Sequence, residues 1–189
     1  DRFNFYDGKG IVEALLGQLG LRSRFKLCDD PFLHPGKAAS ITINDFKVGV
    51  IGEVHPLVNE AFNIDDGAVI FFELDLRDLL SASLEFPRLQ PLPRYPSSIR
   101  DIAILVDKSV SSAEVKLVVE GEPMVERAVL FDVYEGEGIP VGKSSLAYRL
   151  YFRSADRTLS SEEVNQAMGK TVKSLERELK ASLRTGAIE

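Results

Sequence analysis

The sequence is poor in the residues that build disulfides and metal sites. Its 189 residues include one cysteine, Cys28, and two histidines, His34 and His55. A single cysteine cannot form a disulfide within the chain, which is typical of a protein from a reducing compartment. Each histidine precedes a proline, and the acidic neighbours Asp29 and Asp30 do not complete a ligand pattern. We therefore expect no metal, and we expect the histidines to make hydrogen bonds in turns.

The chain also lacks a long hydrophobic run and an excess of basic residues. No apolar stretch approaches the ~20 residues that cross a bilayer, and no signal-peptide pattern is present, so we expect a cytoplasmic protein. The net charge of −6 argues against a protein that binds duplex nucleic acid through its phosphates. Up to Gln90 there are 9 basic and 14 acidic residues, and after it 14 and 15. The nearly neutral second half suits a protein that binds a few unpaired bases.

Prolines divide the chain into two domains. Residues 86–96 contain four prolines, and proline interrupts both helices and central strands. We expect a linker at 86–96, a first module at 1–85 and a second domain at 97–189. Because Asp1 leads directly into apolar residues and an amphipathic helix, we expect the chain to be excised from a longer one.

The first module reads as an antiparallel α+β unit. The apolar spacing predicts a helix over 10–19, and a short helix follows Pro56 over 57–62. Alternating residues predict a hairpin of strands 39–43 and 46–54 around Asn44 and Asp45. A strand over 69–74 and a helical turn over 76–81 complete the module.

The second domain is predicted to alternate strands and helices. Its strands cover 98–106, 125–134 and 143–153, and its helices cover 111–120 and 160–179. Both helices begin with a capping box, Ser111 with Glu114 and Ser160 with Glu163. Residues 179–184 fit either a continued helix or a last strand. With that strand the order is β-α-β-β-α-β, the ferredoxin-like unit.

Side-chain alternation assigns two faces to the long-loop hairpin in this domain. The prediction places Val129, Phe131 and Val133 on one side of the first strand and Leu130, Asp132 and Tyr134 on the other. On the second strand, one face is predicted to carry Leu146, Tyr148, Leu150 and Phe152. The other face is predicted to carry the mixed set Ser145, Ala147, Arg149, Tyr151 and Arg153. On the strand over 98–106, Ile102, Ile104 and Val106 are expected to face the helices, and Ala103 the open side. The open face is thus expected to gather Ala103, Asp132, Tyr134 and Ser145.

Four short motifs of this domain, in this order, resemble the carboxy-terminal anticodon-binding domain of the bacterial phenylalanyl-tRNA synthetase β subunit. They are RDIA at 100–103, FDVYEG at 131–136, KSSLA at 143–147 and RTLS at 157–160. The strings FNFYDGKGIVEALL at 3–16, LHPG at 33–36 and IGEVHP at 51–56 are similar to the preceding module of that subunit. That family commonly has a glycine where Lys180 stands. The resemblance implies a partial, inactive class II synthetase-like module followed by a ferredoxin-fold anticodon-binding domain.

The resemblance also implies a base-binding site. The residue matching Tyr134 stacks on the first anticodon base, and those matching Asp132, Ser145 and Ala103 contact the edges of that base. An ionised Asp132 accepts the neighbouring N–H donors of a guanine. Arg149, Arg153 and Arg157 are candidate phosphate contacts. The alternatives are that Tyr134 is only a strand-end residue and that Asp132 pairs with Arg149.

For the whole enzyme the resemblance implies an (αβ)₂ ligase that joins phenylalanine to its tRNA with ATP and magnesium. The adenylate chemistry is expected in the α subunit, so this fragment is expected to bind no cofactor and to have no catalytic residue. The first module is expected to support assembly. The alternative is a structural or regulatory domain whose open sheet face binds a protein or a small effector.

One apparent phosphate-binding motif is rejected. Gly142-Lys143-Ser144 ends like a phosphate-binding loop, but Glu137 occupies the position of the required first glycine. The segment also leads into a predicted strand and not into a helix.

Overall fold

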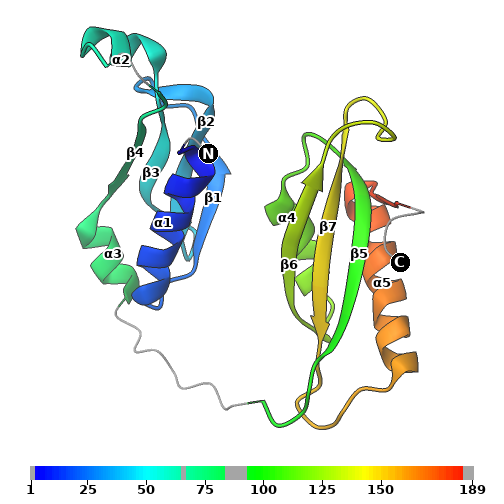
Figure 1. Cartoon of the computed structure of the whole chain (residues 1–189). Helices are drawn as coiled ribbons and strands as arrows, with labels where there is room; N and C mark the ends of the chain where they lie inside the picture. The colour runs from blue at the N-terminus through cyan, green and yellow to red at the C-terminus, as the bar shows by residue number, and fades with distance from the viewer. Residues whose placement is uncertain (1–2, 65–66, 84–92, 185–189) are drawn as a thin grey trace. The chain divides into compact units, whose positions relative to one another are not determined.

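The computed structural model describes residues 3–64, 67–83 and 93–184, and the chain divides into two compact units between Gln90 and Pro91 (Figure 1). Most of the predicted linker at 86–96 lies outside the described residues, and residues 93–97 form neither helix nor strand. In the described ranges, no helix has the length and apolar character needed to cross a membrane.

The first unit is a four-stranded antiparallel sheet in the order β1-β2-β3-β4. Its elements are α1 (Phe5–Gln18), β1 (Ser23–Leu27), β2 (Leu33–Ile43), β3 (Phe46–Val54), α2 (Pro56–Ala61), β4 (Ile70–Leu74) and α3 (Leu76–Ser83). The predicted hairpin is confirmed as β2 and β3, and both turn residues, Asn44 and Asp45, have positive φ. Asparagine and aspartate tolerate this left-handed backbone better than most residues. Strand β1 was not predicted from the residue pattern.

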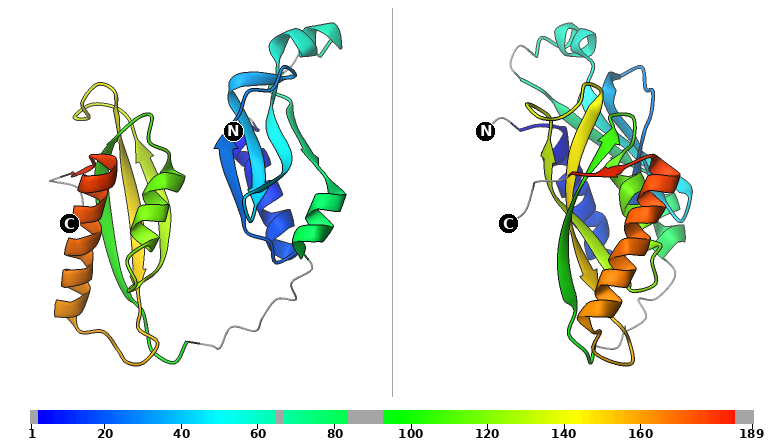
Figure 2. Two further views of the ribbon diagram at one scale, coloured as in Figure 1. Left: turned by 180° about the vertical axis from the view of Figure 1, so that it is seen from behind. Right: turned by 90° about the vertical axis from the view of Figure 1, so that its right-hand side faces the viewer.

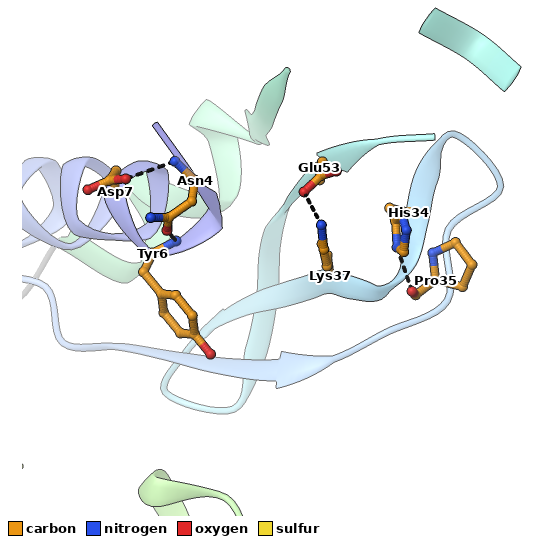
Figure 3. Close-up of polar contacts among 7 residues, drawn as sticks. All are labelled: Asn4, Tyr6, Asp7, His34, Pro35, Lys37 and Glu53. Atoms are coloured by element: carbon orange, nitrogen blue, oxygen red, sulfur yellow. Dashed lines mark hydrogen bonds and ion pairs between the residues drawn. The ribbon is translucent and has the colours of Figure 1, made fainter. Parts of the chain in front are cut away.

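Helix α1 begins five residues before its predicted start. Asn4 is the N-cap: its side chain accepts a hydrogen bond from the Tyr6 amide at 2.8 Å, and Asp7 accepts one from the Asn4 amide at 2.8 Å (Figure 3). The prediction began at the first apolar repeat and missed this cap. Val12 and Leu16 of α1 are completely buried against the sheet, together with Ile41.

The second unit has the β-α-β-β-α-β order of a ferredoxin-like domain. Its elements are β5 (Ser98–Asp107), α4 (Ser112–Glu120), β6 (Val125–Tyr134), β7 (Lys143–Phe152), α5 (Ser161–Leu179) and β8 (Ser182–Leu183). The antiparallel sheet has the order β6-β7-β5-β8. Ser111 and Ser160 are the N-caps of α4 and α5, as their capping boxes predicted. Residues 182–183 form a short last strand, so the ferredoxin-like alternative for the tail is confirmed.

Both helices pack on one face of this sheet (Figure 2). Val115 of α4 and Val164 of α5 are completely buried, in one core with Leu150 and Phe152 of β7. The hydroxyl of Tyr148, also buried there, donates a hydrogen bond to the Ser112 carbonyl at 2.8 Å, and burial raises the pKa of Tyr148. This bond satisfies the one polar group that the ring takes into the core. Among the described residues 93–184, no helix packs on the opposite face of the sheet, which we call the open face.

One part of the predicted side-chain alternation is wrong. On β6, Leu130 lies opposite Tyr148 and Asp132 lies opposite Ala147, so Phe131 is an extra residue in a β-bulge. The bulge reverses the alternation before it: Leu130 packs against the helix-side core, whereas Val129 lies opposite Arg149 on the open face. Alternation alone could not show this, because a bulge depends on how two strands pair.

Candidate nucleic-acid interface

Three strands bring the four predicted site residues onto the open face. Tyr134, the last residue of β6, lies directly opposite Ser145 of β7. Asp132 lies opposite Ala147, which in turn lies opposite Ala103 of β5. Neighbouring strands are about 4.8 Å apart, so Asp132 and Ala103 are separated by about 10 Å across the sheet. This is the span of one nucleobase with its contacts.

Asp132 is exposed. Within the part of the chain that the structure describes, its carboxylate makes no hydrogen bond or ion pair. The alternative that Asp132 pairs with Arg149 is wrong. Arg149 is held by Asp101 of β5, through Nε to Oδ1 at 2.8 Å and Nη2 to Oδ2 at 2.7 Å. The bond from Arg149 holds the pKa of Asp101 below its usual value.

The ring of Tyr134 stands at the edge of this site. It is 38% exposed, and its hydroxyl donates a hydrogen bond to the carbonyl of Glu137 in the following loop at 3.2 Å. Gly136 lies against the same hydroxyl, and a Cβ at that position would come within 2.8 Å of it. The loop therefore fixes one end of the ring and leaves part of its surface to solvent.

Arg184 is a site residue that was not predicted from the sequence. Its amide donates to the Ala103 carbonyl at 2.9 Å, which continues the pairing of β8 with β5 and directs Arg184 to the open face. The guanidinium carbon lies 5.2 Å from the centre of the Tyr134 ring, and Nη1 lies 3.5 Å from the Ser145 hydroxyl. The available signal was the alternation from Leu183, but only if the tail was taken as a strand.

Small residues form the floor between these larger side chains. Ser145, Ala103 and Ala147 are 3%, 7% and 8% exposed. Beside them, at the free edge of β5, lies an open cavity of about 530 Å³. Arg184 and Arg149 line it on the open face. The site therefore combines one free carboxylate, one aromatic ring and one guanidinium around a floor of small residues.

Two of the predicted phosphate contacts lie at the other end of the domain. Arg153 follows β7, about 26 Å along the strand direction from Ser145 at 3.3 Å per residue, and it pairs with Glu126 at 3.0 Å. Arg157 pairs with Glu163 in the first turn of α5 at 2.5 Å. The structure thus brings Arg149 near the four site residues and leaves Arg153 and Arg157 beyond the reach of the same nucleotide.

In the first unit, both histidines make hydrogen bonds to residues close to them in sequence. The ring of His34 bonds the carbonyl of Pro35 at 2.6 Å, and His55 accepts from the Leu57 amide at the start of α2. Among the residues that the structure describes, no three histidine, cysteine, aspartate or glutamate side chains are grouped to hold a metal ion.

Family models match both units of the chain. Residues 93–184 match the ferredoxin-fold anticodon binding domain, and residues 1–76 match the phenylalanyl tRNA synthetase beta chain CLM domain. The chain belongs to the phenylalanine–tRNA ligase beta subunit family. The two matches confirm the α+β fold and the family that the motifs indicated.

Curated relatives are similar in sequence to this chain over nearly its whole length. The phenylalanine–tRNA ligase beta subunits of Geobacillus kaustophilus and Geobacter sulfurreducens are each 39% identical over 185 residues, which is 96% of this chain. That of Syntrophotalea carbinolica is 40% identical over 188 residues. In all three relatives the matched region is 23% of the length. The chain therefore corresponds to less than a quarter of a beta subunit of this family.

Proposed function

We propose that residues 93–184 bind the anticodon loop of phenylalanine tRNA on the open face of their sheet. Tyr134 stacks on the first anticodon base, Asp132 accepts hydrogen bonds from the edge of that base, and Ser145 donates or accepts one more. Ala103 leaves room for the base to approach the backbone. The observation that carries the proposal is the free carboxylate of Asp132 beside an exposed ring, in a domain that matches an anticodon-binding family.

Arg184 adds positive charge to this site. Within the described residues no carboxylate pairs with it, so its guanidinium can turn from the Tyr134 ring to a phosphate of the loop. Arg149, Arg153 and Arg157 also stay predicted phosphate contacts. Each of these three would share its guanidinium between a phosphate and the carboxylate that it already binds.

We propose that the chain acts as part of a cytoplasmic (αβ)₂ phenylalanine–tRNA ligase. ATP, magnesium and the adenylate chemistry are assigned to the α subunit, and the first unit is assigned to assembly. The match of residues 1–76 to the phenylalanyl tRNA synthetase beta chain supports this division. The fragment alone is then expected to bind tRNA without aminoacylating it.

A titration tests the site directly. A synthetic stem-loop with the phenylalanine anticodon is titrated against the chain by NMR or filter binding. Tyr134→Ala is expected to weaken binding by about 1 to 3 kcal/mol, the usual contribution of one stacked base. The matched control is Tyr95→Ala, outside the helices and strands. Unchanged affinity in Tyr134→Ala would overturn the proposed site and favour a face that binds a protein or an effector.

A further inference from the structure

Among the described residues, the open face carries three arginine–aromatic pairs, and the proposed function uses one of them. The guanidinium carbon lies 5.2 Å from the ring centre in Arg184 with Tyr134, 5.5 Å in Arg149 with Phe131 and 3.9 Å in Arg127 with Tyr151. The middle pair lies next to the Tyr134 site, because Phe131 immediately precedes Asp132.

Phe131 is exposed and does not contribute to the hydrophobic core. Its side chain is 51% exposed, and it belongs to neither buried cluster of the chain. The β-bulge removes it from the alternation of β6 and leaves its ring beside Arg149 on the open face. Bulges often redirect a side chain next to a functional site. A large ring exposed in this way is available to a ligand.

Arg149 is fixed in place beside that ring. Nε and Nη2 are held by the two oxygens of Asp101, which leaves Nη1 as the donor that no described residue engages. The bidentate bond restricts the side chain before any ligand arrives. Because Asp101 neutralises its charge, Arg149 adds a flat polar surface to the Phe131 ring with little net charge. This arrangement suits a nucleobase better than a phosphate alone.

The distance to the Tyr134 site matches one nucleotide step. Phe131 lies at the level of Ala147 and Tyr148 on β7, between two and three residues from Ser145. At 3.3 Å per residue this is about 7 to 10 Å along the sheet. An extended RNA strand with one base on Tyr134 can therefore place its next base on Phe131. Proteins that bind single strands commonly stack successive bases on successive aromatic side chains.

We propose that Phe131 and Arg149 form a second base-stacking subsite for the nucleotide adjacent to the one on Tyr134. The subsite rests on the proposed function, since it uses the same strand of RNA. Phe131 stacks on the base, and Nη1 of Arg149 donates to that base or to its phosphate. The ligand is thus at least two consecutive unpaired nucleotides that lie along β6.

The test combines a protein variant with an altered RNA. Phe131→Leu keeps an apolar side chain and removes the ring, and Val133→Ala on the same strand, 53% exposed, is the matched control. Each protein is titrated with the anticodon stem-loop and with loops that carry one abasic nucleotide in place of each anticodon base. Phe131→Leu is expected to bind the intact loop at least five-fold more weakly than the wild type. The deficit is expected to fall below two-fold when the base next to the first anticodon base is missing.

Each other outcome is decisive. If Tyr134→Ala weakens binding and Phe131→Leu does not, the second subsite is wrong and the anticodon site stands. If neither variant changes the affinity, both proposals fail. An equal deficit of Phe131→Leu with every RNA would show that Phe131 only supports the fold, which also overturns the subsite. A thermal melt of each variant confirms that the exposed substitution leaves the domain folded.

Discussion

Leu130 and Asp132 lie two residues apart on β6 and face opposite sides of the sheet. Leu130 is opposite the buried Tyr148, whereas Asp132 is opposite Ala147 on the open face. The extra residue, Phe131, makes this possible. One bulge therefore keeps an apolar side chain in the core and places a carboxylate and an aromatic ring side by side in solvent.

The free carboxylate of Asp132 predicts a preference for guanine. A carboxylate can accept both neighbouring N–H groups of guanine, whereas an amide has one acceptor and presents N–H donors to the second group. Asp132→Asn should therefore weaken binding of the anticodon stem-loop by about ten-fold, as for the loss of a hydrogen bond to a charged group. Inosine in place of the first anticodon guanine removes one donor and should reduce this difference.

Asp156→Asn is the charge-matched control for that experiment. Asp156 is exposed in the loop after β7, so its substitution should leave the affinity unchanged. Equal affinity of wild type and Asp132→Asn for guanine and inosine loops would exclude Asp132 from base recognition. The measurement is the same filter-binding titration.

The charge of Arg184, which no carboxylate among the described residues neutralises, predicts a salt effect. One phosphate contact to single-stranded RNA contributes about 0.7 to the slope of log K against log salt concentration. Arg184→Gln should lower the slope by about this amount. Arg177→Gln, in the last turn of α5 and paired with Glu178, should not change it. An unaltered slope in Arg184→Gln would place Arg184 away from the RNA backbone.

The pair of Asp101 and Arg149 predicts a pH-dependent contribution to stability. Because Arg149 lowers the pKa of Asp101, the pair stabilises the fold above the unfolded pKa of about 3.9. This stabilisation is lost as the pH falls through the lower pKa of the folded state. Asp101→Asn should lower the free energy of unfolding by about 0.5 to 1 kcal/mol at neutral pH. Denaturation at about pH 2, below the unfolded pKa, should give a smaller difference, and an equal difference at both pH values would contradict the prediction.

The backbone of Lys180 predicts a stabilising substitution. Lys180 ends α5 with φ of 52°, a left-handed conformation in which a side chain is strained and glycine is not. Lys180→Gly should raise the free energy of unfolding by about 0.5 to 1 kcal/mol. Lys170→Gly, at an exposed position inside α5, should lower it by about 1 kcal/mol. Urea denaturation of the two variants checks the opposite signs, and a destabilised Lys180→Gly would show that the lysine side chain supports the turn.

The sequence by itself determined the features that depend on near neighbours. The capping boxes of Ser111 and Ser160 placed both helix starts, because a cap and its partner lie three residues apart. Alternation placed Ala103, Asp132, Tyr134 and Ser145 on one face, and short motifs indicated the family. The last strand could not be assigned from the sequence, because two residues carry too little pattern to distinguish a strand from the end of a helix.

Only the tertiary structure decided the features that depend on strand pairing. The bulge at Phe131 exists because ten residues of β6 must match the register of β7, and that register is a contact between distant segments. The same holds for Arg184, which reaches the open face only because β8 pairs with β5. The partner of Arg149 was also a matter of pairing, since Asp101 lies directly opposite it. Local sequence limits what each segment can form, and the packing of segments far apart in the chain selects which side chains meet.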